Sequence, residues 1–99
     1  MQEISFVKEF GSEIGKPIKE MISDSEIPEK AKILRYLMSF EPDCAAGMSL
    51  VDEVTGNTID SGVSGYEDGE YYWDTREIYH FDKYNLELNV DFIKYVLSK

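Results

Sequence analysis

The chain has no lysine or arginine between Arg35 and Arg76, a gap of 40 residues. The same stretch carries nine acids: Glu41, Asp43, Asp52, Glu53, Asp60, Glu67, Asp68, Glu70 and Asp74. The rest of the chain mixes both signs, so the middle is a separate electrostatic unit in a protein of net charge −10. Gathered on one surface, such a block attracts positively charged partners and repels nucleic acid and anionic membranes. The missing bases therefore favour a protein that binds a basic partner.

Cysteine and histidine are each present only once, which argues against several kinds of site. The single cysteine, Cys44, leaves no internal disulfide and is typical of a reducing compartment. Its neighbours Ala45 and Ala46 favour a buried structural thiol over a nucleophile. The single histidine, His80, has no second histidine for a metal and no candidate nucleophile to activate, so we interpret it as structural. The sequence predicts a protein that is not an enzyme, with no catalytic residue, no metal and no cofactor.

Long hydrophobic runs are absent as well. No apolar stretch approaches the roughly 20 residues of a membrane span, and residues 1–4 do not resemble the start of a signal peptide. With 42% hydrophobic and 13% aromatic residues, the chain can still build a core. At 99 residues, that core belongs to a single domain, residues 1–99. We expect a soluble cytoplasmic domain, a monomer when free, with no nucleic-acid or membrane partner.

Apolar residues recur at helical spacing in the first part of the chain. Residues 4–14 carry one apolar stripe, limited by Gly11 and a breaker at 15–17, and predict a short helix. A stronger pattern surrounds Pro28, which suits a first helical turn, and predicts a helix over 27–39.

Two more helices are predicted near the end of the chain. Asp74 and Glu77 have the spacing of a capping box ahead of a helix over 75–83. Asn89 is a candidate cap for a last helix.

Between these helices the pattern changes to that of strands. Residues 48–54 and 58–63 flank Gly56-Asn57, which predicts a hairpin with a two-residue loop. That register would place Glu53 opposite Asp60, an unfavourable pair of like charges. Such a pair suggests a surface kept acidic for a partner.

A third strand is predicted over 70–73, where three aromatic residues follow one another. Alternation places Tyr71 and Trp73 on one face, which we expect to be core, and Tyr72 on the other, which we expect to be exposed. The order α, α, β, β, β, α, α predicts an α+β fold: a small three-stranded antiparallel sheet with helices packed on one face.

Acids of the middle and one exposed aromatic are the candidate partner-binding residues: Asp52, Glu53, Asp60, Glu67, Asp68, Glu70 and Tyr72. The acids supply charge that speeds association with a basic partner, and the tyrosine supplies contact area. The segment 67–70 is only superficially like a cation loop, because it lacks the alternating ligands and distal glutamate of a calcium loop.

Three motifs follow one another over residues 66–97: Asp68-Gly69-x-x-x-Trp73, then Tyr79-His80-x-x-x-Tyr84-x-Leu86-x-Leu88, then Phe92-Ile93-x-x-Val96. This pattern resembles small immunity proteins encoded beside bacterial polymorphic toxins, including those of contact-dependent growth inhibition systems. The resemblance implies a cytoplasmic protein that neutralises a cognate toxin domain, often a nuclease, by stoichiometric binding. The acidic middle fits that reading, because nucleases present basic clefts to phosphates.

Two other classes of function stay open. One is an acidic interaction or adaptor module whose partner is not a toxin. The other is an enzyme built on two carboxylates, which would need two acids converging in an apolar cleft with separated pKa values. Acids scattered along solvent-facing turns are poor candidates for that arrangement.

Overall fold

A four-stranded mixed sheet and three α-helices make up the computed structural model, which describes residues 1–99. The strands are β1 (Gln2–Glu3), β2 (Cys44–Val51), β3 (Thr58–Glu67) and β4 (Tyr71–Asp74), in the spatial order β1-β4-β3-β2. The helices are α1 (Lys30–Leu37), α2 (Thr75–Tyr84) and α3 (Val90–Leu97). The last three strands are antiparallel, and β1 adds to β4 in parallel. The predicted α+β class is confirmed, but the sheet has one more strand than predicted and is mixed.

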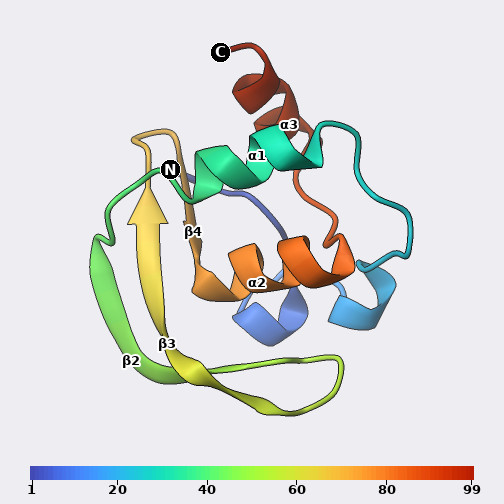
Figure 1. Ribbon diagram of the computed structural model, residues 1–99, viewed down its shortest axis with the longest axis vertical. Coiled ribbons are helices and arrows are strands. Elements are labelled where there is room, and N and C mark those ends of the chain that lie inside the picture. Colours follow the sequence, from blue (N-terminus) through green and yellow to red (C-terminus); the bar gives the residue numbers. More distant parts are fainter.

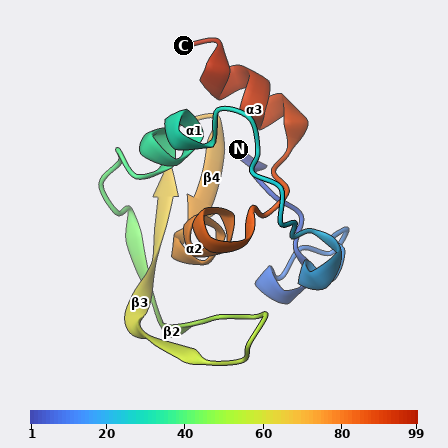
Figure 2. The ribbon, with the colours of Figure 1, turned by 45° about the vertical axis from the view of Figure 1, so that its right-hand side comes forward.

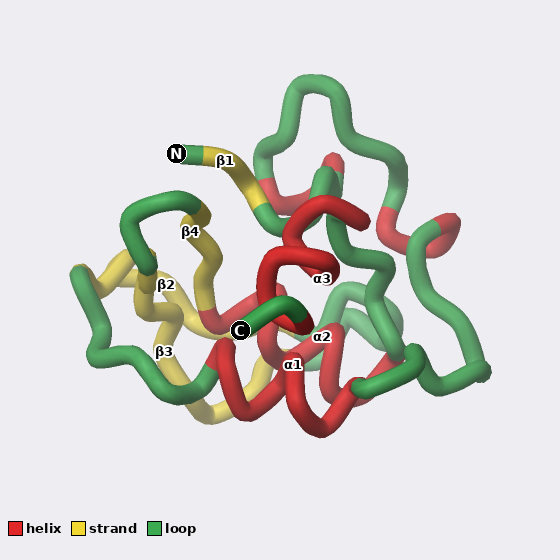
Figure 3. Tube along the Cα trace, turned by 90° about the horizontal axis from the view of Figure 1, so that it is seen from above, coloured by secondary structure: helices red, strands yellow, loops and turns green.

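The three helices gather on one side of the sheet (Figures 2 and 3). α2 runs beside β3 and β4, and α1 lies above it next to α3 (Figure 1). α1 is shorter than the helix predicted over 27–39, because Glu29 has a left-handed φ of 62° that helical residues do not adopt. None of the helices is both long and apolar enough to cross a membrane.

The core lies between β4 and the helices and forms one cluster of buried side chains. Trp73 is 1% exposed, and its Nε1 donates a hydrogen bond to the carbonyl oxygen of Leu37 over 3.3 Å. Tyr71 packs against Phe92 of α3, with the ring centroids 5.0 Å apart. Tyr72, which points to the other face of β4, is 42% exposed. The predicted alternation along this strand is therefore confirmed.

Side-chain caps fix where the last two helices begin. Asp74 accepts a hydrogen bond from the backbone N–H of Arg76 (2.8 Å), and Glu77 accepts one from the N–H of Asp74 (3.1 Å). Asp74 also accepts from the backbone N–H of Glu77, and this bond together with the return bond from Glu77 confirms the predicted capping box at the start of α2. Asn89 accepts from the N–H of Asp91 (2.9 Å) and caps α3 as predicted.

The N-terminal helix predicted over 4–14 does not form. The N–H of Gln2 donates to the carbonyl of Glu70 (3.0 Å), so the chain begins as β1, and only short 3₁₀ turns follow. The chain then reverses so closely that a Cβ on Gly15 would lie 2.7 Å from the backbone of Phe6. Ile4 and Val7 of this segment are buried in the core although the chain is extended there and not helical.

The β2–β3 hairpin has a six-residue loop, so the predicted two-residue loop is wrong. Val51 pairs with Thr58, which leaves residues 52–57 between the strands. This register removes the predicted pairing of Glu53 with Asp60. Like-charge repulsion across the hairpin therefore gives no argument for an acidic binding surface.

Cys44 is exposed, so the prediction of a buried thiol is also wrong. It begins β2, the outer strand of the sheet (Figure 1), and pairs with Gly65 of β3. Its sulfur lies over Gly65, where an added Cβ would be only 2.8 Å away. An edge strand offers its apolar residues less cover than a central strand, which is why Cys44 stays exposed.

Candidate functional site

The fold separates the seven predicted binding residues into two groups at opposite ends of β3 (Figure 1). Three lie in the β2–β3 loop and the start of β3, and four lie between the end of β3 and the start of β4: Asp52, Glu53 and Asp60, then Glu67, Asp68, Glu70 and Tyr72. Asp60 and Glu67 are both in β3, and at about 3.3 Å per residue the strand holds them up to roughly 23 Å apart. The predicted residues therefore do not form a single surface.

Asp52 is buried, at 1% exposure, and its carboxylate is used inside the fold. It accepts hydrogen bonds from the hydroxyls of Tyr79 (2.7 Å) and Tyr84 (2.5 Å). It also accepts from the backbone N–H groups of Val54 (2.9 Å) and Thr55 (3.0 Å). Burial by itself would raise the pKa of Asp52, but these hydrogen bonds outweigh it and hold the pKa well below its usual range. Asp52 fastens the hairpin loop to α2 and leaves no free oxygen for a partner.

Replacing Asp52 with asparagine should lower the free energy of unfolding by about 1.5–3 kcal/mol, because hydrogen bonds to a charged acceptor are lost. The folded-state pKa is lowered, so this stabilisation is present above the ordinary value of 3.8 and is lost as the pH falls. The measurement is urea unfolding of both proteins at neutral pH and in acid. Asp60→Asn, in the same hairpin but exposed, is the matched control and should change little. Equal losses for the two variants would contradict the role given to Asp52.

His80 connects the same loop to α2 through backbone groups. The N–H of Glu53 donates to His80 Nε2 (3.0 Å), and His80 Nδ1 donates to the carbonyl of Arg76 (2.7 Å). The first contact requires an unprotonated Nε2 and the second a protonated Nδ1, so this is a neutral ring. The ring is fully buried with both nitrogens occupied, in agreement with a structural histidine.

Asp68 is a second acid used by the fold. Its carboxylate accepts from the Tyr36 hydroxyl (2.5 Å) and from the backbone N–H groups of Glu70 (2.9 Å) and Tyr71 (2.8 Å). Burial opposes ionisation, but these hydrogen bonds outweigh it and lower the pKa of Asp68. Asp68 thus shapes the β3–β4 turn and joins it to α1. A turn-forming aspartate before Gly69 is the sequence signal for such a role.

A groove crosses the sheet on the face that carries Tyr72, away from the core side of β4. Its volume is about 340 Å³, near the lower end of the roughly 300–1,000 Å³ usual for small-ligand pockets. Its lining is mostly apolar and comes from all three long strands and the N-terminus: Met1, Asp43, Cys44, Ala46, Val63, Gly65, Tyr66, Glu67, Tyr72, Trp73 and Asp74. Of the predicted binding residues, the groove contains Glu67 and Tyr72.

Strand pairing puts Glu67 and Tyr72 side by side in this groove. Glu67 of β3 is directly opposite Tyr72 of β4, and Tyr72 is in turn opposite Glu3 of β1. Paired residues share a face of the sheet, so one exposed aromatic ring has a glutamate on either side. The next pairing along β3 joins Gly65 to Asp74, and the sulfur of Cys44 lies over Gly65.

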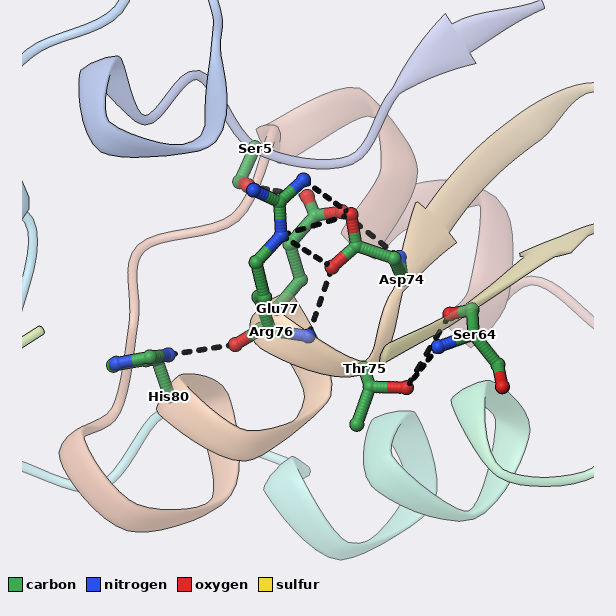
Figure 4. A network of polar contacts seen from close by, with 7 residues as sticks. All are labelled: Ser5, Ser64, Asp74, Thr75, Arg76, Glu77 and His80. Atoms are coloured by element: carbon green, nitrogen blue, oxygen red, sulfur yellow. Dashed lines mark hydrogen bonds and ion pairs between the residues drawn. The ribbon is translucent and has the colours of Figure 1, made fainter. Parts of the chain in front are cut away.

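Two of the groove's carboxylates have no partner within the protein. Asp74 is occupied, because Arg76 binds it through Nε (3.1 Å) and Nη2 (2.8 Å), as Figure 4 shows. The side chains of Asp43 and Glu67 make no hydrogen bond and no ion pair, and no lysine or arginine lines the groove. Asp43 was not among the predicted binding residues, because only the pairing of β2 with β3 brings it to the same groove as Glu67.

Two other hollows also hold acids without a hydrogen bond or ion pair, but neither contains an exposed aromatic ring such as Tyr72. One of about 370 Å³ contains three acids beside apolar residues: Glu20, Glu26 and Glu87. The other, of about 460 Å³, lies between the N-terminal segment and α3 and has a single acid, Glu87. Another, of about 290 Å³, carries three bases and no acid: Lys32, Arg35 and Lys99. Arg35 is in the last turn of α1 and Lys99 follows the end of α3, where cations complement the helix dipoles.

The most strongly perturbed acid of the chain lies beside α2 in a small pocket of about 90 Å³. Glu77 is 7% exposed and accepts a 2.5 Å hydrogen bond from the Ser5 hydroxyl, next to its cap on Asp74 (Figure 4). Burial raises the pKa of Glu77 to about 8. A raised pKa is common in acid–base catalysts, but these contacts tie the N-terminal segment to α2 and indicate a structural role.

Neither a metal site nor a similarity to a known protein identifies a different functional site. No three His, Cys, Asp or Glu side chains lie close enough to form a metal site. The groove is thus the place where exposed aromatic surface, apolar floor and unpaired negative charge meet. Comparison with protein families, curated proteins and solved structures finds no match to the chain.

Proposed function

We propose that the protein is a non-catalytic binding protein that neutralises a cognate bacterial toxin domain in the cytoplasm by forming a stoichiometric complex. The toxin domain would be basic and of the nuclease type. The observation that carries the proposal is the groove, where Asp43 and Glu67 are unpaired above an apolar floor. A basic partner supplies the cations that these acids lack, and the apolar floor supplies contact area.

The charge of the whole chain supports the same partner. The chain has ten basic and twenty acidic residues, and only two of the acids, Asp52 and Asp74, form ion pairs within 4.0 Å. The remaining negative field accelerates encounter with a basic domain. A nuclease cleft that binds phosphates has the charge required, so an acidic protein placed over it blocks the substrate. The resemblance of residues 66–97 to immunity proteins points to the same class.

The first test uses the neighbouring gene. An immunity protein is encoded next to its toxin, so the upstream gene should encode a large secreted protein with a variable C-terminal domain. Expression of that domain in a bacterial host should stop growth, and co-expression of this protein should restore it. A gene context of metabolic enzymes, or a toxic domain that this protein does not neutralise, would favour an interaction module with a non-toxin partner.

The second test removes charge from each end of β3 separately. Asp43→Asn with Glu67→Gln alters the groove, and Glu53→Gln with Asp60→Asn alters the hairpin by the same net charge. We expect the groove pair to weaken affinity for the toxin domain at least tenfold, or about 1.4 kcal/mol, and the hairpin pair to change it little. Both pairs should slow association and reduce its salt dependence, because steering depends on total exposed charge.

Surface plasmon resonance across a salt series measures both quantities. Equal affinity losses for the two variant pairs would mean that the groove has no special part in binding. Unchanged affinity and unchanged salt dependence would mean that these acids are hydrated surface groups with no role in binding.

A further inference from the structure

We infer that the groove receives an arginine side chain of the partner, with the guanidinium over Tyr72 and beside Glu67. This inference rests on the proposed function, because it names the chemical group that a basic partner would place in the same site. Its basis is the arrangement of a hollow, an aromatic ring and unpaired carboxylates on three neighbouring strands.

The floor of the groove suits the aliphatic part of a long side chain. The sulfur of Cys44 covers Gly65, and Ala46 and Val63 line the same hollow with apolar side chains. Long basic side chains bury their methylene groups along such apolar surface and keep the charged end at the edge. A carboxylate partner would leave the same floor in contact with a polar group and would be repelled by Asp43.

The edge of the groove suits the charged end. Glu67 and Tyr72 are cross-strand partners, so an acid and an aromatic ring stand about 5 Å apart at their Cβ atoms. A guanidinium is planar, stacks on an aromatic face and donates in a fixed fork to carboxylates. A lysine ammonium is also attracted to an aromatic face, but it lacks the planar surface that stacks on the ring and the fixed fork of donors. The side chain of Glu3, on the far side of Tyr72, adds a second negative charge to the same row.

A second copy of this chain is a poor occupant. Two copies would each bring a net charge of −10, and the groove's own acids would face each other across the interface. Arg76, the one arginine near the site, already binds Asp74 and lies 5.0 Å from the Phe10 ring centroid. Arg76 is therefore not available to pair with Asp43 or Glu67.

A peptide titration tests the chemistry of the groove alone. The probe is acetyl-Gly-Gly-Arg-Gly-Gly-amide, and the controls carry norleucine or lysine in place of arginine. Backbone amide shifts of the labelled protein should saturate in the millimolar range at Cys44–Ala46, Val63–Glu67 and Tyr72. Glu67→Gln should weaken arginine binding severalfold, and Asp60→Asn should not. Absence of saturable shifts, shifts centred on the hairpin, or an equal response to norleucine would overturn the inference.

Filling the groove tests the inference in the complex. Ala46→Arg places a guanidinium on the groove's own floor, and Ala45→Arg adds the same charge at an exposed neighbour that does not line it. We expect the first variant to lose toxin neutralisation by roughly tenfold or more and the second to retain it within a few-fold. Neutralisation by Ala46→Arg at the wild-type level would overturn the arginine site and leave the proposed function standing. Failure of the wild-type protein itself would instead reject the proposed function.

Discussion

Replacing Trp73 with alanine is expected to lower the free energy of unfolding by about 3–5 kcal/mol, the range for a large aromatic removed from a core. The side chain is 1% exposed and lies at the centre of an aromatic cluster. Its ring centroid is 5.5 Å from that of Phe40 and 6.0 Å from that of Phe92. The substitution would therefore open a cavity between β4 and two helices.

The variant also removes a hydrogen bond that the helix needs. Trp73 Nε1 donates to the carbonyl of Leu37, the last residue of α1, where carbonyl groups have no partner within the helix. Loss of this donor leaves a buried acceptor unsatisfied, which adds to the cost of the cavity. We expect α1 to loosen first, because the variant leaves only the Tyr36–Asp68 hydrogen bond between α1 and the β3–β4 region of the sheet.

Tyr72→Ala is the matched control for this experiment. Tyr72 is the next residue of the same strand, is aromatic, and faces the solvent side of the sheet. Its replacement should cost about 1 kcal/mol or less. Chemical denaturation of the wild type and both variants gives the comparison. Similar losses for the two variants would mean that the faces of β4 are assigned wrongly.

Local signals in the sequence were sufficient for the last part of the fold, from β4 to α3. The capping box of Asp74 and Glu77 joins residues three apart, so its spacing is visible without any tertiary information. Period-two alternation likewise assigned Tyr71 and Trp73 to the core and Tyr72 to the exposed face. These features depend on neighbouring residues, which a sequence displays directly.

Long-range contacts explain the errors. Gly56-Asn57 predicted a tight hairpin, but the observed loop is wider. The carboxylate of Asp52 holds this wider loop because it accepts hydrogen bonds from Tyr79 and Tyr84 in α2. Such hydrogen bonds link residues 27 and 32 positions apart and have no local pattern. The N-terminal stripe of apolar residues has helical spacing, but pairing with β4 draws the chain into a strand.

The candidate site shows the same division. Glu67 and Tyr72 were selected from charge and exposure, and strand pairing places them together. Asp52 and Asp68 were selected for their charge alone, and the carboxylates of both accept hydrogen bonds within the protein. They are therefore not free to bind a partner. The contribution of β2 to the groove could not be predicted, because it follows from how that strand is paired with β3.

Glu77 should make the protein less stable as the pH rises from about 5 to 8. Burial raises its pKa from an ordinary value of 4.5 to about 8, with a further increase from the charge of Asp74. The Ser5 hydrogen bond and Arg76 act in the opposite direction without cancelling the effect of burial. Glu3, Tyr72 and Arg76 line the same pocket, and Arg76, the one basic side chain among the lining residues, is paired with Asp74.

The direction of the effect follows from where the proton is held. Between pH 4.5 and about 8, the folded protein keeps the proton on Glu77, while the unfolded chain releases it. Stability falls with pH wherever the folded state binds more protons, and it levels off above the folded-state pKa. At about 1.36 kcal/mol per pH unit, the full change is on the order of 3–5 kcal/mol.

Glu77→Gln isolates this contribution, because glutamine keeps the shape and an acceptor for the N–H of Asp74 but cannot ionise. The expected result is similar stability of the two proteins near pH 5 and a more stable variant at pH 8.5, by roughly 3–5 kcal/mol. Urea unfolding at a series of pH values gives both curves, and the difference between them removes the contributions of all other acids. Glu70→Gln, at an exposed position of the β3–β4 turn, should give a curve parallel to the wild type. If Glu77→Gln also ran parallel to the wild type from pH 5 to 8.5, the carboxyl group would have to be ionised throughout. The tie between Ser5 and α2 would then be a charge-assisted contact that remains intact at alkaline pH.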